Sequence, residues 1–199
     1  MVRSSREVTA QHKDRILDVA AQKVKQQGVN GVTIPDVMQA AGMTQGGFYT
    51  HFASKDDLTA QAMRHAFEKQ RDLLKQLSSA WEGNHRGASD ALAGMYVSRV
   101  DPERIGLGCP ISALVGDVAR SPVDSPLRSV WAEQLNQNVS IMAALGGELD
   151  GEVTPEQRAR ALVRLATLIG TAVLSRATSG DPLETELRAA VLASLTSPE

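Results

Sequence analysis

Residues 33–58 read TIPDVMQAAGMTQGGFYTHFASKDDL, and this stretch contains the signals of short helices joined by tight turns. Thr33, Thr44 and Ser54 are each predicted to cap a helix, because a side-chain oxygen at that position accepts a hydrogen bond from a free backbone N–H. Gly42 closes the first of these helices, where a glycine commonly ends a helix. A short helix, a tight turn and a second short helix together predict a helix-turn-helix unit.

Gly46 and Gly47 lie in the first turn of the predicted helix 45–51, although a glycine weakens a helix by about 1 kcal/mol relative to alanine. DNA binding offers a reason for them, because a residue without a Cβ leaves room for the DNA backbone and bases to approach. Phe48 and Phe52 are four residues apart, so both are predicted to pack inward on one face. The two glycines are therefore predicted to lie close to DNA.

Polar side chains occupy the other positions of this segment. Tyr49, Thr50 and His51 can donate hydrogen bonds to phosphate oxygens, whereas Gln45 can read the edge of a base. Lys55 lies in the first turn of the following helix, where free N–H groups also favour an anion. These residues are predicted to face DNA.

The span from Ile16 to Leu58 resembles the DNA-binding domain of the TetR family of bacterial one-component transcriptional regulators. The matching motifs are G-x-x-x-x-T-I-x-D-V at 28–37, A-A-G-M-T at 40–44 and G-x-F-Y-T-H-F-x-S-K-x-x-L at 46–58. The resemblance implies an all-α fold. It consists of a helix-turn-helix, three-helix DNA-binding domain at 1–55 and an all-helical ligand-binding and dimerisation domain at 56–199.

The resemblance also implies that Arg3 and Arg6 form a flexible arm and that several motif residues contact DNA. Together with the positions argued above, the predicted DNA-binding set is Arg3, Arg6, Thr33, Thr44, Gln45, Gly46, Gly47, Tyr49, Thr50, His51 and Lys55. The chain departs from the family at Gly46-Gly47, where a single glycine is usually flanked by a side chain that can contact DNA. One position that usually contacts a base is therefore expected to make no such contact, and sequence specificity is expected to depend on Gln45, His51 and DNA shape.

The rest of the chain also reads as helix, and no stretch predicts a strand. Apolar spacing and capping residues predict helices at about 7–27, 54–77, 90–100, 110–120, 127–145, 155–178 and from Pro182 onward. Gly28 ends the first helix. Gly83, Asn84 and Gly87 predict a loop over 78–89.

Charge is unevenly distributed, since the first 55 residues hold seven Lys and Arg against four Asp and Glu in a chain of net charge −2. This excess favours an anionic partner, although it also fits a solvated helix face. No apolar run approaches the roughly 20 residues that span a bilayer, and the N-terminus lacks a secretory signal. A cytoplasmic protein without a membrane partner is expected. A single cysteine excludes a disulfide framework and a cysteine-cluster metal site, and no metal or cofactor is expected.

Two stretches near the C-terminus are predicted to form a dimer interface. Apolar and small residues form one stripe in 155–178 (Leu162, Leu165, Ala166, Ile169, Gly170 and Val173), and Leu183, Leu187, Val191 and Leu195 repeat every four residues in 182–196. Two such helices from each subunit can form a four-helix bundle in a homodimer. The alternative is that they only cover their own core.

The predicted ligand-binding residues are Met95, Tyr96, Cys109, Trp131 and Met142. The methionines and aromatic residues offer adaptable apolar surface, although each also suits an ordinary core. Cys109 precedes Pro110 at a predicted helix start, where free N–H groups and the positive helix end would stabilise a thiolate. Cys109 is accordingly a candidate sensor of electrophiles or oxidants, with an inert packing cysteine as the alternative.

These features predict a ligand-responsive DNA-binding transcriptional regulator. In the expected form, a homodimeric repressor leaves a palindromic double-stranded operator when a small-molecule inducer or a reactive electrophile acts on its body. One alternative is an enzyme with Cys109 as nucleophile. That reading lacks support, since histidines 12, 51, 65 and 85 are expected in or near the DNA-binding half, without a third group to orient them. The other alternative is a helical dimer that binds proteins.

Overall fold

The computed structural model describes residues 5–98, 105, 106, 108–145 and 152–196, which are helical apart from their connections and contain no strand. The helices are α1 (Ser5–Gly31), α2 (Ile34–Ala40), the 3₁₀ helix η1 (Gln45–Thr50), α3 (Lys55–Ala80), α4 (His85–Ser98), α5 (Pro110–Arg120), α6 (Pro126–Ala143), α7 (Pro155–Ala177) and α8 (Pro182–Thr196). The predicted all-α class is confirmed. In the described ranges no helix is both long and apolar enough to cross a bilayer.

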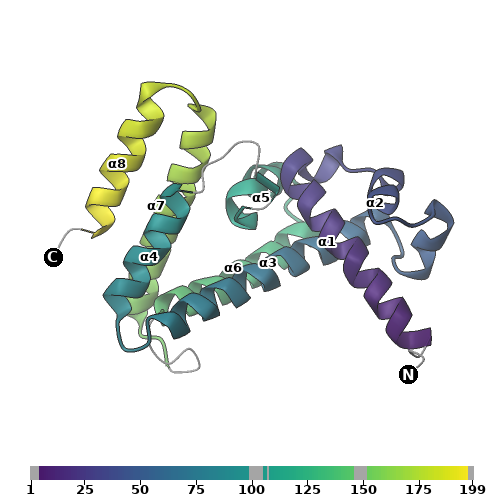
Figure 1. Ribbon diagram of the computed structural model, residues 1–199, viewed down its shortest axis with the longest axis horizontal. Helices are drawn as coiled ribbons and strands as arrows, with labels where there is room; N and C mark the ends of the chain where they lie inside the picture. Colours follow the sequence, from purple (N-terminus) through teal and green to yellow (C-terminus); the bar gives the residue numbers. More distant parts are fainter. Residues whose placement is uncertain (1–4, 99–104, 107, 146–151, 197–199) are drawn as a thin grey trace.

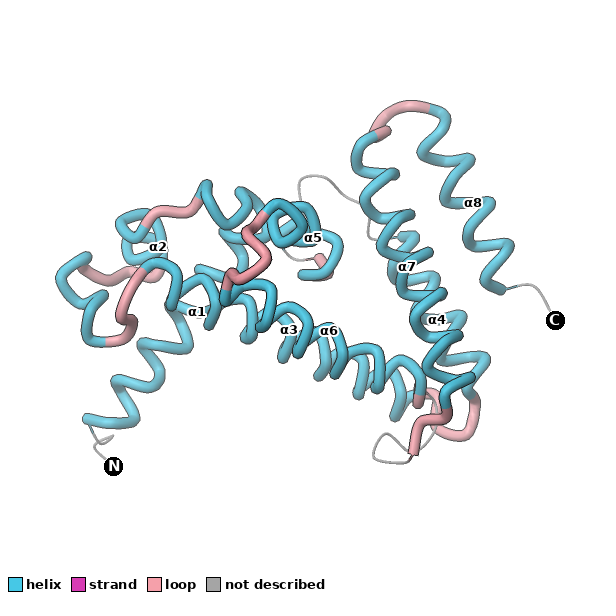
Figure 2. Tube along the Cα trace, turned by 180° about the vertical axis from the view of Figure 1, so that it is seen from behind, coloured by secondary structure: helices cyan, strands magenta, loops and turns pink. Residues whose placement is uncertain are grey.

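Two long helices, α3 and α6, lie side by side along the molecule (Figure 1). The N-terminal half of α1, with α2 and η1, lies at one end, and α4, α7 and α8 lie at the other. α5 lies between the two ends, where it packs on the C-terminal half of α1 and on α7 (Figure 2). α3 therefore runs from the N-terminal end to the end that holds α4, whereas α1 reaches from the N-terminal end only into the middle.

Two of the three predicted capping residues, Thr33 and Ser54, do what the sequence predicts. The Thr33 hydroxyl accepts a hydrogen bond from the Asp36 backbone N–H (3.3 Å), and the Ser54 hydroxyl accepts one from the Asp57 N–H (3.1 Å). Gly42 follows α2 with a φ of 73°, a left-handed conformation that favours glycine. The turn of the predicted helix-turn-helix is thus set by its sequence.

The segment after this turn differs from the prediction, because residues 45–50 form a 3₁₀ helix instead of an α-helix. The side chain of Thr44 occupies the N-cap position but makes no capping hydrogen bond with any described residue, so its predicted capping role is wrong. Two successive glycines disfavour a regular α-helical turn. The tighter i to i+3 pattern appears in the bonds from Gly47 N–H to Thr44 O (3.1 Å) and from His51 N–H to Phe48 O (2.9 Å).

The predicted loop 78–89 is also too long. α3 continues to Ala80 and α4 begins at His85, because the Asn84 side chain accepts a hydrogen bond from the Gly87 N–H (2.8 Å) and caps the helix. Gly87 is therefore helical, and only Gly83 of the two glycines has a left-handed φ, at 76°.

The remaining helix starts and stops follow the sequence closely. Gly28 interrupts α1 with a φ of 75° and a ψ of 169°. α5 starts at Pro110 directly after Cys109, and α7 starts with a complete capping box between Thr154 and Gln157. Proline at the first helical position makes both starts predictable, and the Thr154 hydroxyl before Pro155 adds to the signal for α7.

Candidate functional site

The exposed face of η1 rests on two buried rings. Phe48 and Phe52 are 0% and 2% exposed, with ring centroids 5.5 Å apart, which confirms that they pack inward. Tyr49 lies edge-on to Phe48 at 5.1 Å, yet 74% of it is exposed. An exposed aromatic residue held by a buried neighbour is a rigid group that can contact a partner. Gln45, Gly46 and Thr50 are exposed on the same segment.

Neither glycine of η1 is required by the rest of the described protein. Both have backbone angles available to any residue, since neither is among the glycines of positive φ. A Cβ on Gly46 would meet nothing within 4 Å, and a Cβ on Gly47 would lie 3.9 Å from the Met38 Cε, an ordinary contact. An intramolecular reason for glycine here is absent from the described residues.

Thr33 and Lys55 are both partly engaged inside the protein. The Thr33 hydroxyl donates to the Asp36 carboxylate (2.6 Å) in addition to capping α2. The Lys55 ammonium donates to the Asn30 carbonyl (3.4 Å), and the long distance leaves its other donors available. Lys55 is thus better placed than Thr33 to bind a phosphate.

Two residues of α1 join this surface without any signal in the motif. The Lys13 ammonium lies 5.6 Å from the centroid of the Phe52 ring. Burial, and the neighbouring His12 and Lys13, lower the pKa of His51, which favours its neutral form at neutral pH. Residues from two helices therefore combine into one basic surface, which sequence spacing alone does not reveal.

The structure agrees only in part with the predicted flexible arm at Arg3 and Arg6. Arg6 is exposed, but it lies in the first turn of α1 and is helical, so the expectation of a flexible arm is wrong at this residue. The polar stretch that follows it contains no glycine or proline, so the helix extends toward the N-terminus. Arg3 lies outside the described residues.

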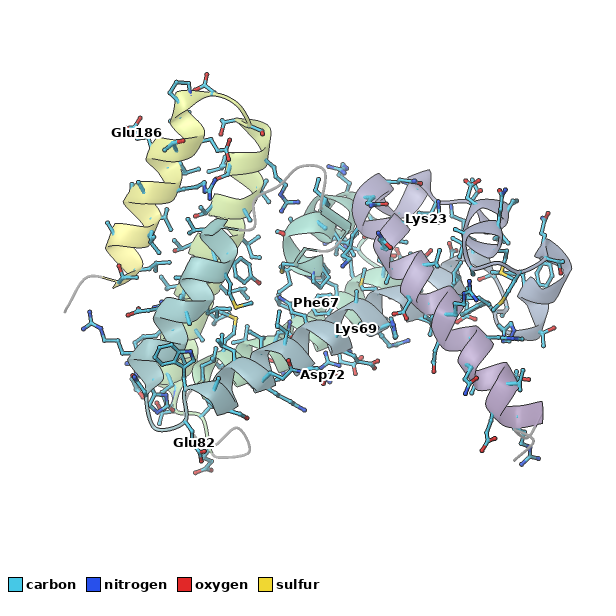
Figure 3. All side chains as sticks on the ribbon, in the orientation of Figure 1. Lys23, Phe67, Lys69, Asp72, Glu82 and Glu186 are labelled. Atoms are coloured by element: carbon cyan, nitrogen blue, oxygen red, sulfur yellow. The ribbon has the colours of Figure 1, made fainter. Side chains whose placement is uncertain are left out.

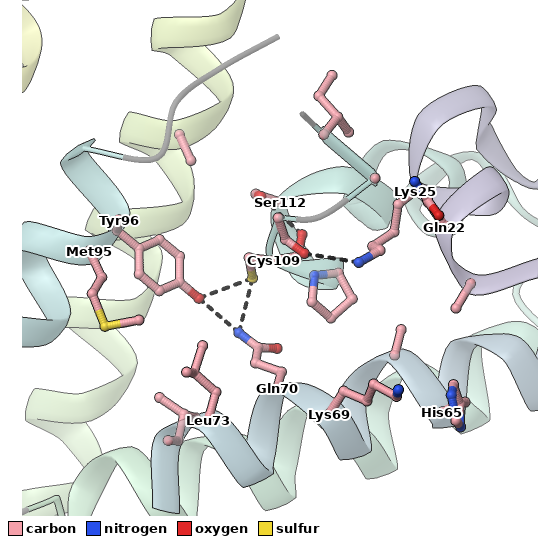
Figure 4. Close-up of a pocket in the computed structure, with 18 of the residues that line it drawn as sticks. Gln22, Lys25, His65, Lys69, Gln70, Leu73, Met95, Tyr96, Cys109 and Ser112 are labelled. Carbon is pink, nitrogen blue, oxygen red and sulfur yellow. Dashed lines mark hydrogen bonds between the residues drawn. The ribbon is translucent and has the colours of Figure 1, made fainter. Parts of the chain in front are cut away.

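A cavity of about 450 Å³ lies in the middle of the molecule, between α1, α3, α4, α5 and α7. This volume is within the range of small-molecule sites. Met95, Tyr96 and Cys109 of the predicted ligand-binding set line it, and Figure 4 shows the Tyr96 hydroxyl in contact with the Cys109 sulfur. The structure thus brings three predicted ligand residues to one site.

Trp131 and Met142 do not line this cavity. Trp131 packs edge-on against the buried Phe67 of α3, with ring centroids 5.5 Å apart, and Met142 is buried in α6. Their assignment to the ligand site is corrected to packing, because the residue types that suit a pocket also suit a core.

Hydrogen bonds converge on the sulfur of Cys109. The Tyr96 hydroxyl (3.0 Å) and the Gln70 amide (3.1 Å) both donate to Sγ. The Gln70 amide also donates to the Tyr96 oxygen (2.9 Å), and the Gln70 carbonyl accepts from the Asn138 amide (2.9 Å), which fixes its orientation. Burial, together with the charge of Cys109 and the bond to its sulfur, raises the pKa of Tyr96 well above its usual value. Tyr96 therefore remains a hydrogen-bond donor.

Charged side chains gather at one end of the cavity, and three of its polar residues come from α1: Asp18, Gln22 and Lys25. Asp18 accepts contacts from His65 and Lys69, each at 2.7 Å. Burial opposes the Asp18 charge, but these two partners outweigh it and hold its pKa below the usual value. Lys69 extends from α3 where α1 crosses it (Figure 3).

Sequence reasoning missed the α1 residues because it assigned the ligand site to the body alone. It also placed His65 in or near the DNA-binding half, whereas His65 lines the cavity that holds Cys109. The hydrogen bonds to the Cys109 sulfur from described residues come from Tyr96 and Gln70, not from His65. Among the described residues no group of three or more His, Cys, Asp or Glu side chains is placed to hold a metal ion.

An apolar surface extends over α7 and α8. Leu162, Val163, Leu174 and Leu183 are 45%, 68%, 53% and 52% exposed. Leu165, predicted on the same stripe as Leu162, is buried against the protomer's own core, so the predicted stripe divides between two faces. No residue of α8 is fully buried.

Comparisons with known proteins agree with this geometry. The model of the family described as "Bacterial regulatory proteins, tetR family" matches residues 16–62. The HTH-type transcriptional regulator BetI of Burkholderia mallei is 26% identical over 181 residues, which cover 86% of this chain and 85% of BetI. The HTH-type transcriptional regulator AcrR of Shigella flexneri is 36% identical over 61 residues, covering 31% of this chain and only 28% of AcrR.

Solved structures share the whole fold. The reduced form of E. coli NemR has a TM-score of 0.74 and 19% identity, and the similarity covers 92% of this chain and 95% of NemR. A TetR-family regulator from Agrobacterium tumefaciens has a TM-score of 0.73 and 18% identity, with coverage of 94% and 99%. At these identities the similarity establishes the fold.

Proposed function

We propose that this chain, which belongs to the TetR family of bacterial regulatory proteins, is a homodimeric repressor that leaves its operator DNA when a small molecule enters the central cavity. The observation that carries the proposal is the face of η1. It presents Tyr49 and Gln45 beside two glycines whose lack of a Cβ has no purpose within the described protein. A close partner at that face explains the glycines, and the family motif around them identifies that partner as DNA.

In this proposal residues 1–55 bind DNA and residues 56–199 bind ligand and form the dimer. Gln45 reads a base, while Tyr49, Thr50, His51 and Lys55 hold phosphates. The cavity lies where the two parts meet, since α1 supplies Asp18, Gln22 and Lys25 to its wall.

The exposed apolar residues of α7 and α8 support a dimer. Leucine and valine side chains exposed together on two neighbouring helices mark an interaction surface. A two-fold dimer would pair α7 and α8 with their copies in a four-helix bundle. It would present two η1 segments to successive major grooves, about 34–36 Å apart.

Cys109 gives a second route to release from DNA. Its sulfur accepts two hydrogen bonds, and the residue lines the cavity at the start of α5. A reactive electrophile that alkylates Cys109 would add bulk inside the cavity and displace α5. NemR, which shares the fold, has been crystallised in a reduced form.

The chain is a regulator and not an enzyme, as the family match and the named relatives show. Contrary to the expectation from the sequence, a histidine does line the cavity that holds Cys109. His65 and Cys109 share the cavity, and Asp18 contacts the His65 ring.

The proposal is tested by electrophoretic mobility shift on the DNA beside the chain's own gene, together with sedimentation. The wild type should sediment as a dimer and shift the DNA. Leu183→Glu, which places a charge on the exposed apolar face, should give a monomer with much weaker DNA binding. Leu183→Gln is the uncharged control and should disturb the dimer less. A stable wild-type monomer at micromolar concentration, with no shift at low salt, contradicts the proposal.

A further inference from the structure

We propose that the cavity binds a small organic carboxylate with an apolar tail, and that its carboxylate lies between Lys25 and Arg176 at the start of α5. This inference rests on the proposed function, because it names the class of the ligand that releases the DNA.

Two cations of the cavity lack a carboxylate partner in the part of the chain that the structure describes. Among the described residues Asp18 is the one Asp or Glu that lines the cavity, and its contacts go to His65 and Lys69. Each of the other two cations, Lys25 and Arg176, lines the cavity, and no ion pair of the described residues includes either of them.

Both cations are half-buried, which makes an unpaired charge costly. Burial lowers the pKa of Lys25 and of Arg176, and the charge of Cys109 opposes that change at each. Both side chains line the same cavity as Cys109. The Lys25 ammonium donates one hydrogen bond to the Gly108 carbonyl (3.2 Å), and the Arg176 Nε donates one to the Ala172 carbonyl (2.8 Å). A carboxylate between them would accept charge-assisted hydrogen bonds from the other donors.

The start of α5 adds to this positive region. Pro110 is the first helical residue, and the N–H groups of Ile111 and Ser112 have no acceptor within the helix, because the first intrahelical bond runs from Ala113 N–H to Cys109 O (3.2 Å). Cys109 makes no side-chain capping hydrogen bond with a described residue. The helix end thus favours an anion beside the two cations.

The opposite end of the cavity is apolar. Figure 4 shows Leu73, Met95 and the Tyr96 ring on one side, and Lys25, Gln22 and His65 on the other. Leu92 and Leu74 are buried along the same wall. A ligand with one charged end and one apolar end matches this division, whereas an inorganic anion would leave the apolar end unfilled.

A carboxylate in this position would connect helices that carry different functions. Lys25 belongs to α1, against which α2 packs, and Arg176 belongs to α7, beside the exposed apolar face. Binding would draw α1 toward α7 and so change the orientation of η1 relative to the dimer. A ligand that binds one orientation of α1 more tightly than the other shifts the population toward that orientation.

The test is isothermal titration calorimetry of the full-length protein with phenylbutyrate and with phenylbutyramide, its uncharged counterpart of nearly the same shape. The wild type should bind the acid about tenfold more tightly than the amide. Lys25→Gln and Arg176→Gln should each remove most of this preference while leaving the amide affinity within about twofold. Lys75→Gln and Arg160→Gln, which change exposed residues of α3 and α7, should keep it. Inorganic phosphate should bind more weakly than the acid.

Unchanged amide binding shows that a variant is folded, so loss of the acid preference cannot be attributed to unfolding. Equal affinities for acid and amide in the wild type, or a preference that survives both cavity substitutions, overturn the inference. A phosphate affinity equal to that of the acid refutes the apolar tail. A mobility shift with ligand-free protein is measured separately. If the ligand-free protein does not shift the DNA, the proposed function is refuted. If it shifts the DNA but shows no preference for the acid, only the proposed ligand class is refuted.

Discussion

Replacing Gly46 or Gly47 with alanine should stabilise the protein and weaken its binding to DNA. The two effects have opposite signs because they arise in different places. Within the described protein a Cβ on Gly46 meets open space, and one on Gly47 makes an ordinary contact with Met38. On DNA the same Cβ would occupy the volume that the glycine leaves for the backbone or a base.

The magnitude follows from this geometry. Alanine in place of glycine, where the backbone angles suit both, gains about 0.4–1 kcal/mol from the reduced freedom of the unfolded chain. For a protein of this size that gain raises the melting temperature by about 1–4 °C. In the complex, an added methyl group in a filled contact costs about 1–3 kcal/mol, which is roughly a 5- to 150-fold loss of affinity.

Gly42→Ala is the matched control, because its glycine is required by the fold. Its φ is 73°, and an added Cβ would lie 3.2 Å from the Arg15 side chain. This variant should lose about 1–3 kcal/mol of stability. Scanning calorimetry measures the melting temperatures, and fluorescence anisotropy measures affinity for operator DNA at fixed salt. If Gly46→Ala and Gly47→Ala bind DNA as tightly as the wild type, η1 does not approach DNA closely and the reasoning is wrong.

Two further predictions concern single side chains. Lys55→Ala should weaken binding to all DNA sequences alike and lower the slope of log affinity against log salt concentration by about one. Gln45→Ala should instead relax the preference at one base pair, at a cost of about 1–3 kcal/mol. A changed sequence preference in Lys55→Ala would reverse these assignments. Treatment with a small electrophile should release the wild type from DNA but not Cys109→Ser. Fluorescence anisotropy before and after treatment measures this release. Equal behaviour of the two proteins would make Cys109 a packing residue.

The elements that the sequence predicts well are those determined by neighbouring residues. Thr33, Ser54 and Thr154 accept hydrogen bonds from N–H groups three residues ahead, so local sequence is sufficient to locate these helix starts. The same locality explains two errors. Asn84 caps α4 inside a stretch that contains two glycines, and η1 tightens to a 3₁₀ helix over its glycine pair. In both cases competing local signals had similar strength.

The cavity was predictable only in part, because its wall is assembled from distant segments. Cys109 was recognisable from its position before Pro110. Lys25 and Arg176 were not, since a half-buried lysine and an ordinary helical arginine look alike in sequence. Trp131 and Met142 were assigned wrongly because size and polarisability do not distinguish a pocket from a core.

The position of α1 suggests how the cavity and the DNA-binding face influence each other. At the cavity, Asp18 joins α1 to His65 and Lys69 of α3, and Lys25 joins it to Gly108 just before α5. At the other end, Lys13 of the same helix lies over Phe52, next to the segment that carries Tyr49. A helix moves more easily as a rigid body than it bends, so a ligand that alters the Lys25 contacts will also move Lys13 and the ring beneath it. Release from DNA then needs no long chain of contacts, because one helix touches both sites.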